Sequence, residues 1–143
     1  MIGTADMILE FPMVDQEPLA RWSFGRVSLL GDAAHPMVPR GSNGAGQAIL
    51  DARALTDCFC ASPEDPVAAL RAYQDRRLEA TANVVRTNRS NPPDAILREV
   101  YLRTGDRPFD DIASVISGAE LAAISDSYKR VAGYDRETLD RPR

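Results

Sequence analysis

Only one segment of this chain, residues 27–30, has the pattern of a buried β-strand. Its sequence, Val-Ser-Leu-Leu, is a short apolar run, and the Gly25-Arg26 pair before it predicts a turn. Residues 11–22 contain Pro12 and Pro18, which favour extended chain or an edge strand over a helix. One strand and one extended segment do not make an independent sheet. The sequence therefore predicts part of a larger fold, in which other strands lie beside residues 27–30.

Helices are predicted over most of the remaining chain. From Gly44 the apolar residues recur every three or four positions, which indicates an amphipathic helix that ends at Ala61-Ser62-Pro63. The predicted buried face of this helix consists of Ala45, Ala48, Ile49, Ala52, Leu55 and Phe59. Further helices are predicted from Asp65-Pro66 to Asn88, over residues 94–104 closed by Gly105, and over residues 120–132 closed by Gly133. Residues 110–117 are ambiguous.

Composition excludes several classes of protein. Hydrophobic residues make up 44% and charged residues 27% of the 143 residues, the balance of a globular protein. The net charge of −4 argues against a nucleic-acid or anionic-membrane surface. No apolar run could span a bilayer, and residues 1–10 lack the basic start of a signal peptide, so we expect a cytoplasmic protein. Cys58 and Cys60 are expected to be reduced, and no metal site is expected because His35 is the only histidine.

Residues 31–46 form the most informative segment: an acidic residue after the strand, a long loop with two prolines, and a glycine-rich helix start. Asp32 emerges at the carboxyl end of the strand, where ligands bind in open α/β sheets. Gly44 and Gly46 allow close approach to the free amides of the first helical turn. The glycines do not form the G-x-G-x-x-G or Walker phosphate motifs. A ligand site and a tight turn without a ligand are both compatible with this pattern.

The same segment resembles the second FAD motif of the FAD-dependent aromatic hydroxylases, the class A flavoprotein monooxygenases. The resemblance rests on Gly31-Asp32-Ala33-Ala34-His35-Pro36, on Pro39, Gly41 and Gly44, and on Ala48-Ile49-Leu50-Asp51-Ala52. The flanking sequences are similar to the phenazine-carboxylate hydroxylase branch of that family; they are residues 11–15, Arg21-Trp22, residues 91–94 and residues 103–109.

The resemblance implies FAD as cofactor and a set of contacts to it. Asp32 would accept a hydrogen bond from a ribityl hydroxyl, and Pro39 would lie beside the isoalloxazine ring near the substrate. Gly41 belongs to the same implied cofactor site. The amides of Asn43, Gly44, Ala45 and Gly46 would face the N1–C2=O edge of the flavin. The implied reaction is hydroxylation of an aromatic small molecule with NAD(P)H and O2, and no residue of this chain is assigned a catalytic role.

The resemblance also implies a fold and a division of the chain. The fold would be α/β, the C-terminal part of a Rossmann-like FAD-binding monooxygenase, mostly helical here with one or two short strands. Residues 1–30 would be the end of the substrate-domain sheet and the last strand of the FAD domain, and residues 31–60 the FAD loop and helix. Residues 61–133 would be C-terminal helices and residues 134–143 a flexible tail.

Two hypotheses about function remain open at this point. The family's first motif, the G-x-G-x-x-G that binds the ADP half of FAD, is absent from these residues. The chain is therefore either the FAD-binding portion of a monooxygenase that needs the rest of the fold, or a truncated, non-catalytic helical remnant that self-associates and binds no flavin. Whether the chain itself is an enzyme stays undecided.

Four other polar positions are interpreted structurally. His35 is expected to pack behind the loop rather than to react. Arg40 is expected to be a solvated loop cation, and Asp51 to cap or pair locally. Arg76, Arg77 and Glu79 are expected to form a solvated helix face.

Overall fold

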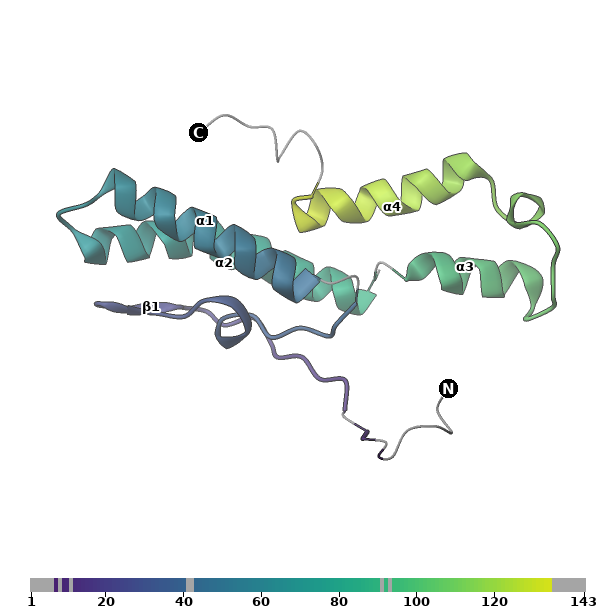
Figure 1. Ribbon diagram of the computed structural model, residues 1–143, viewed down its shortest axis with the longest axis horizontal. Helices are drawn as coiled ribbons and strands as arrows, with labels where there is room; N and C mark the ends of the chain where they lie inside the picture. The colour runs from purple at the N-terminus through teal and green to yellow at the C-terminus, as the bar shows by residue number, and fades with distance from the viewer. Residues whose placement is uncertain are drawn as a thin grey trace.

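The computed structural model describes residues 7, 9–10, 12–40, 43–90, 92 and 94–134. The described elements lie along one long axis, with two long helices at one end and two shorter helices at the other (Figure 1). This part of the chain is mostly helical with one short two-stranded sheet, as the sequence predicts. The tail predicted for residues 134–143 lies outside the described residues except for Tyr134.

The N-terminal segment is extended, as the prolines predict, from residue 12 to residue 22; Phe11 lies outside the described residues. It is held along α2 (Pro66–Ser90) by Arg89, whose Nε lies 2.7 Å from the Asp15 carboxylate. The backbone N–H groups of Trp22 and Ser23 both donate to Gln74 Oε1 at 2.9 Å. The segment thus runs alongside α2 and places Trp22 in the core.

The short sheet is a hairpin of β1 (Ser23–Phe24) and β2 (Val27–Ser28), antiparallel with Phe24 opposite Val27. Gly25 has a φ of 64°, the positive value that the first position of a type II′ hairpin turn requires. The predicted turn is confirmed, but the prediction of a buried strand over residues 27–30 is wrong. Only Val27–Ser28 is strand, and 63% of Val27 is exposed, because β1 is its only described strand neighbour and no described element covers it.

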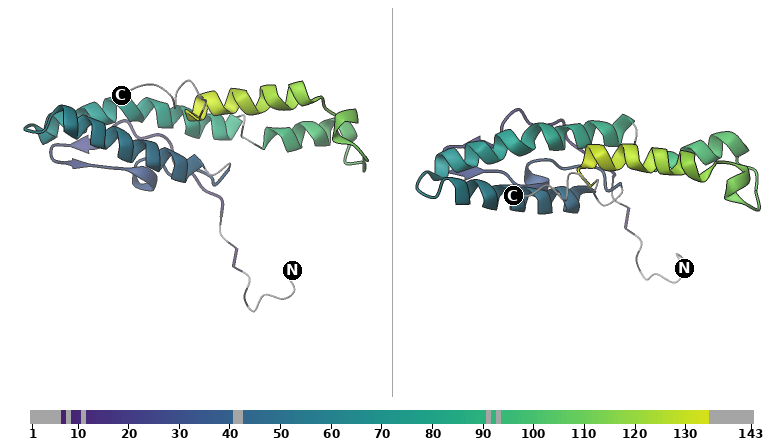
Figure 2. Two further views of the ribbon diagram at one scale, coloured as in Figure 1. Left: turned by 45° about the horizontal axis from the view of Figure 1, so that its top comes forward. Right: turned by 90° about the horizontal axis from the view of Figure 1, so that it is seen from above.

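The long helices α1 (Asn43–Ala61) and α2 run antiparallel, side by side, and the hairpin runs alongside them (Figure 2). The predicted cap of α2 is confirmed, since Asp65 Oδ1 accepts from the N–H groups of Val67 and Ala68 at 3.1 and 2.9 Å. The core lies between these helices and the N-terminal segment. Its residues are Trp22, Ala34, Ala54, Cys58, Ala69 and Tyr73, with Leu19, Leu29, Leu55 and Leu78 packed against them.

The orientation of α1 is opposite to the one that its apolar period predicts. The buried residues of α1 are Asn43, Gln47, Asp51, Ala54 and Cys58. The predicted buried face is largely exposed, and 71% of Ile49 is accessible. The reason is that α2 supplies polar partners for the face that carries Gln47 and Asp51, as described below, whereas no described element covers Ile49.

Beyond α2 the chain forms a second helical pair, α3 (Ala95–Thr104) and α4 (Gly118–Ala132), joined through the short 3-10 turn η3 (Ile112–Ser114). The predicted ends of α3 and α4 at Gly105 and Gly133 are confirmed, with φ values of 61° and 73°. The α4 helix starts two residues earlier than predicted, because Ser117 and Glu120 form a capping box. No residue of α3 is buried, and α4 runs back to the start of α1 (Figure 1).

Candidate functional site

The acidic residue of the loop and the first turn of α1 face each other. Asp32 lies in a 3-10 turn, η2 (Gly31–Ala33), and its side chain is exposed. A Cβ atom built on Gly44 would lie 3.6 Å from Asp32 Oδ1 and 3.8 Å from Met37 Cγ. None of the described residues donates a hydrogen bond to the Asp32 carboxylate, so within the described part of the chain its oxygens are available to a ligand.

The first turn of α1 offers free donors beside that carboxylate. The N–H groups of Asn43, Gly44 and Ala45 precede the first intrahelical hydrogen bonds, and no described residue outside α1 accepts from them. Together with the helix dipole they make this end of α1 electropositive. The Asp32 carboxylate and the backbone donors of Gly44 and Ala45 therefore lie side by side at one place on the surface.

The other predicted site residues are only partly brought together. Pro39 and Ala45 are exposed, on the loop and on the first turn, whereas Gly41 lies outside the described residues. Asn43 is fully buried, backbone included, so neither its side chain nor its N–H group is accessible to a ligand on the outside. The Cβ direction of Gly46 points at the ring of Tyr134 rather than at open space. The assignment of these residues to a cofactor stays a prediction.

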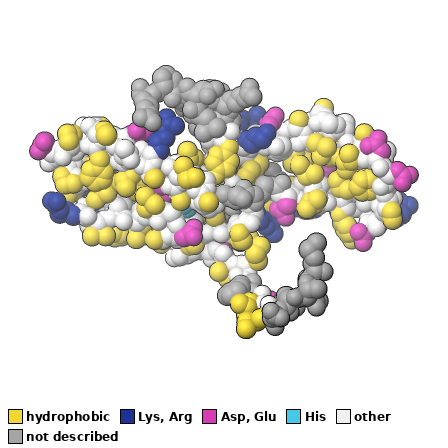
Figure 3. Space-filling view, viewed as in Figure 1, with side chains coloured by type: hydrophobic (Ala, Val, Ile, Leu, Met, Phe, Trp, Pro, Cys, Tyr) yellow, Lys and Arg dark blue, Asp and Glu magenta, His cyan; other side chains and the backbone are white. Residues whose placement is uncertain are grey.

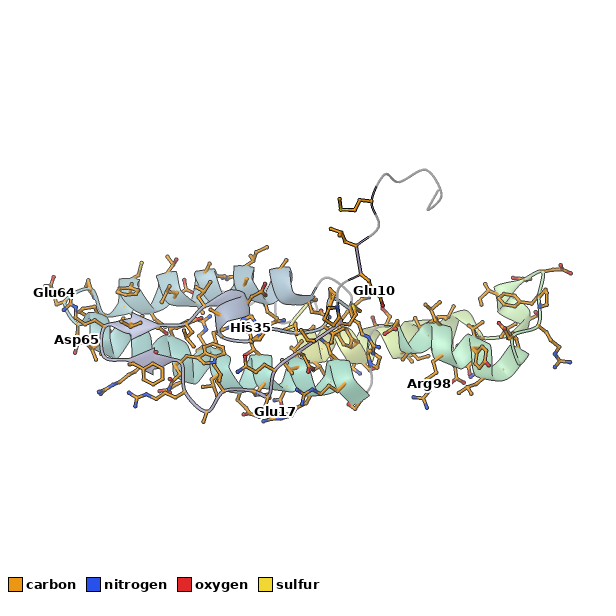
Figure 4. The ribbon with its side chains drawn as sticks, turned by 90° about the horizontal axis from the view of Figure 1, so that it is seen from below. Glu10, Glu17, His35, Glu64, Asp65 and Arg98 are labelled. Carbon is orange, nitrogen blue, oxygen red and sulfur yellow. The ribbon has the colours of Figure 1, made fainter. Side chains whose placement is uncertain are left out.

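A buried polar network lies directly behind the loop and fixes its start. Asp51 Oδ2 accepts from the N–H of Gly31 at 3.2 Å and lies 2.6 Å from His35 Nε2. Its other oxygen accepts from Arg77 Nε at 2.7 Å. Figure 4 shows His35 in the middle of the molecule, among the side chains of the long helices. Asp51 and His35 thus hold the residues on both sides of Asp32.

The charge of Asp51 is stabilised although the residue is fully buried. Burial by itself opposes ionisation, but the hydrogen bonds from His35 and Arg77 outweigh it and lower the pKa of Asp51 below its ordinary value. Arg77 also donates from Nη2 to Gln47 Oε1 at 2.6 Å. The network is therefore an internal ion pair with its polar groups largely satisfied.

The expectation that Arg77 is a solvated cation is wrong: only 9% of the residue is exposed. The expectation that Asp51 pairs with a residue near it in the sequence is wrong, because its partner Arg77 is on another helix. The expected burial of His35 behind the loop is confirmed. One sequence signal could have revealed this network. Asn43, Gln47 and Asp51 recur every four residues and form a polar stripe along one face of α1.

A second buried cluster joins the start of α1 to the end of α2 and to α4. The Asn43 side-chain amide donates to Tyr128 Oη and to Asn88 Oδ1, and Tyr128 Oη in turn donates to Asn88 Oδ1. Burial raises the pKa of Tyr128 to about 12, so its hydroxyl is neutral and able to donate. Arg40 is half-buried, with Nη1 3.4 Å from the Asn88 carbonyl oxygen, so it is less solvated than expected.

Other kinds of site are not formed by the described residues. They contain no group of three or more His, Cys, Asp or Glu side chains able to hold a metal ion. Cys58 is buried and Cys60 exposed, and both are free thiols. No helix among the described elements has the length and apolar character needed to cross a membrane.

Comparison with known proteins agrees with the motif at this site. Residues 9–88 match the family model described as FAD binding domain. The phenazine 1,6-dicarboxylic acid hydroxylase PhzS of Lysobacter antibioticus is 40% identical over 131 residues, which cover 92% of this chain and 29% of that protein. The 3-amino-4-hydroxybenzoate 2-monooxygenase PtmB3 of Streptomyces platensis is 39% identical over 87% of this chain and 33% of its own length.

A third relative, the 6-hydroxynicotinate 3-monooxygenase of Bordetella bronchiseptica, is 38% identical over 76% of this chain and 26% of its own length. The chain thus spans about a third or less of the length of these curated relatives. The resemblance drawn from the motif of residues 31–52 is confirmed. The chain belongs to the FAD binding domain family, and FAD is the cofactor of that family.

Proposed function

We propose that this chain supplies the flavin-contacting part of an FAD-dependent monooxygenase that hydroxylates an aromatic small molecule with NAD(P)H and O2. The observation that carries the proposal is the exposed Asp32 carboxylate, to which no described residue donates, beside the amides of the α1 first turn. The names of the relatives support the reaction class, since each is a hydroxylase or monooxygenase of an aromatic acid.

The residues at this place fit the proposed cofactor. FAD has hydroxyl groups along its ribityl chain, and an exposed carboxylate without a described donor is an acceptor for one of them. The isoalloxazine edge at N1 and C2=O becomes negative on reduction, and the free amides at a helix start are suitable donors for it. Gly44 carries no side chain that would fill the space between these amides and Asp32.

FAD, when bound, supplies the redox chemistry with NAD(P)H and O2, and the chain supplies position and electrostatics. Asp32 orients the ribityl chain. The accessible N–H groups of Gly44 and Ala45 would stabilise negative charge at the flavin edge, by about 0.3–1 kcal/mol for a typical helix dipole. Pro39 lies exposed on the loop between these two contacts, and Gly41 is assigned to the cofactor site by the motif alone. The pair Asp51 and His35 keeps Asp32 in place from behind.

We further propose that the described elements belong to a Rossmann-like FAD-binding fold of larger size, divided as the motif implies at residues 30, 60 and 133. The exposed apolar side chains of the hairpin and of α1, Val27 and Ile49 among them, are suited to pack against further strands of such a fold. The length of the relatives supports this reading. The two free thiols are consistent with a cytoplasmic protein.

Replacement of Asp32 by Ala tests the proposed function. In a complete flavoenzyme that contains this chain, Asp32→Ala should weaken FAD binding by about 1.5–3 kcal/mol, because a charge-assisted hydrogen bond is lost. The measurement is fluorescence titration of the apo-enzyme with FAD. The matched control is Asp75→Ala, which removes an exposed carboxylate from the outer surface of α2. Equal FAD affinity of the Asp32→Ala and Asp75→Ala proteins would remove Asp32 from the site.

A further inference from the structure

The C-terminal end of α4 is docked on the first turn of α1, the turn to which the proposed function assigns the flavin contact. Gln47 Nε2 donates to the Ala132 carbonyl oxygen at 2.7 Å, and Tyr134 Oη donates to the Asn43 carbonyl oxygen at 3.4 Å. The Asn43 side chain meets Tyr128 in the buried cluster described above. These contacts join residues 85 to 91 positions apart in the sequence, so they are tertiary and not local.

Gly46 is the place where this contact is tightest. A Cβ atom at Gly46 would lie 2.6 Å from Cζ and 3.2 Å from Cε1 of Tyr134, and would overlap the hydroxyl oxygen. Gly46 is not among the described residues with positive φ, so its backbone conformation does not require glycine. The absence of a side chain at this position therefore makes room for the tyrosine ring.

The two glycines of the turn thus serve different neighbours. Gly44 and Gly46 are two positions apart on a helix and point in different directions. Gly44 faces the Asp32 loop with ordinary van der Waals spacing, whereas Gly46 faces Tyr134. A cofactor-contacting role explains Gly44 but does not explain the close approach at Gly46.

We propose that Tyr134 is a positioning residue. Its ring packs against Gly46 and, together with Tyr128, holds the first turn of α1 against α4. The role of that turn towards flavin rests on the proposed function. Tyr134 is not among the atoms nearest to the Cβ position of Gly44, which are those of Asp32 and Met37. It acts through the backbone of Asn43 and Gly46, and so determines where the free amides of the turn lie. Burial raises the pKa of the Tyr134 hydroxyl, which keeps it protonated as a donor.

A double-mutant cycle on the 143-residue chain tests the contact between Gly46 and Tyr134 without FAD. Gly46→Ala should lower the midpoint of thermal unfolding by about 3 °C or more, because the new methyl group displaces the ring. In the Tyr134→Ala background the same change should raise the midpoint by up to about 3 °C, because alanine is the better helix former. If Gly46→Ala alone does not fold, restored folding in the double variant supports the contact between Gly46 and Tyr134.

Two matched controls accompany the cycle. A Cβ at Gly118 meets no atom within 4 Å, and one at Gly44 meets only ordinary contacts, so Gly118→Ala and Gly44→Ala should not lower the midpoint. The proposal would be overturned if Gly46→Ala lowered the unfolding midpoint equally with and without Tyr134, or if the double variant failed to fold.

Hydrogen exchange followed by mass spectrometry tests the positioning itself. Tyr134→Ala should speed exchange in residues 43–50 about tenfold and leave residues 66–80 unchanged, because the turn loses its support while the core keeps its packing. The control is Tyr101→Ala, which removes an exposed tyrosine from α3. Unchanged exchange in residues 43–50, or an equal rise along the whole chain, would contradict a positioning role. This readout needs no cofactor, so it fails or succeeds separately from the Asp32→Ala titration.

Discussion

Asp51 holds a full charge at the centre of the molecule, with no exposure to solvent, between a histidine on the loop and an arginine on α2. Such a pair gains little over apolar packing, but removal of one partner leaves the other charge buried without compensation. The main role of Asp51 at this position is to hold neighbouring groups in place. It ties Gly31, His35 and Arg77 together, and the exposed Asp32 lies between two of the groups that it holds.

Asp51→Asn should therefore lower the free energy of unfolding by about 3–5 kcal/mol, because the buried Arg77 loses its counter-charge although the side-chain volume is kept. Urea unfolding of the two proteins measures the difference. The control is Asp57→Asn, which breaks an exposed pair with Arg76 at 3.3 Å and should cost about 0–1 kcal/mol. A similar small effect of both changes would show that the buried pair does not stabilise the fold.

The same residue gives the molecule an acid-sensitive element. The pKa of Asp51 is lowered in the folded state from its ordinary value of 3.8, so the unfolded chain binds the proton more readily. The stabilisation is complete above pH 3.8 and is lost as the pH falls through the lower folded-state value. We expect the urea midpoint to drop on acidification below about pH 4, and to drop less in Asp51→Asn. Parallel pH profiles for the two proteins would exclude Asp51 as a source of the loss.

At the scale of elements, α4 has a clear cap at each end, a capping box at Ser117 and a left-handed glycine at Gly133. Ser117 accepts from the Glu120 N–H at 3.2 Å, and Glu120 accepts from the Ser117 N–H at 3.0 Å. Hydrogen bonds from Arg103, and then from Ser117, lower the pKa of Glu120 to about 2. Arg103 also contacts Glu99 and the Val115 carbonyl oxygen, and so links α3 to the start of α4.

Ser117→Ala should lower the free energy of unfolding by about 1 kcal/mol, the usual loss of an N-cap side chain. The effect should be accompanied by faster hydrogen exchange at the start of α4. Thr56→Ala serves as control, since its hydroxyl bonds only the Ala52 carbonyl one turn away on the exposed side of α1. If the two variants are equally stable, the capping box contributes nothing in solution.

At the scale of the whole molecule, the described elements leave much apolar surface uncovered. Figure 3 shows hydrophobic side chains spread over the long helices and over the α3–α4 pair. Exposed apolar side chains on the hairpin, α1 and α3 include Phe24, Val27, Ile49, Leu97, Tyr101 and Leu102. Surfaces of this kind usually mark contacts with further protein.

The 143-residue chain, purified by itself, should therefore form dimers or larger species and should carry no stoichiometric FAD. Size-exclusion chromatography with light scattering and absorbance near about 450 nm measures both properties. Ile49→Glu should reduce the association. The control is Ala72→Glu, which adds the same charge to an exposed position of α2 beside Arg71, Asp75 and Arg76. A yellow monomer of the unchanged chain would contradict both expectations.

The sequence by itself determined the features that depend on neighbouring residues. The cap at Asp65, the helix ends at Gly105 and Gly133 and the turn at Gly25 are all where the residue types predict them. These signals act within about four residues of backbone, so they do not depend on distant packing. The motif of residues 31–52 is equally local, and it predicts the family that the match over residues 9–88 shows.

Only the tertiary structure decided which faces are buried. The apolar period of α1 predicted Ile49 inside, but the buried stripe is Asn43, Gln47 and Asp51. A polar side chain is stable in the interior when distant groups satisfy it, and those groups come from α2 and α4. Local periodicity contains no information about Arg77, or about a tyrosine 88 residues beyond Gly46 that fills the space above it.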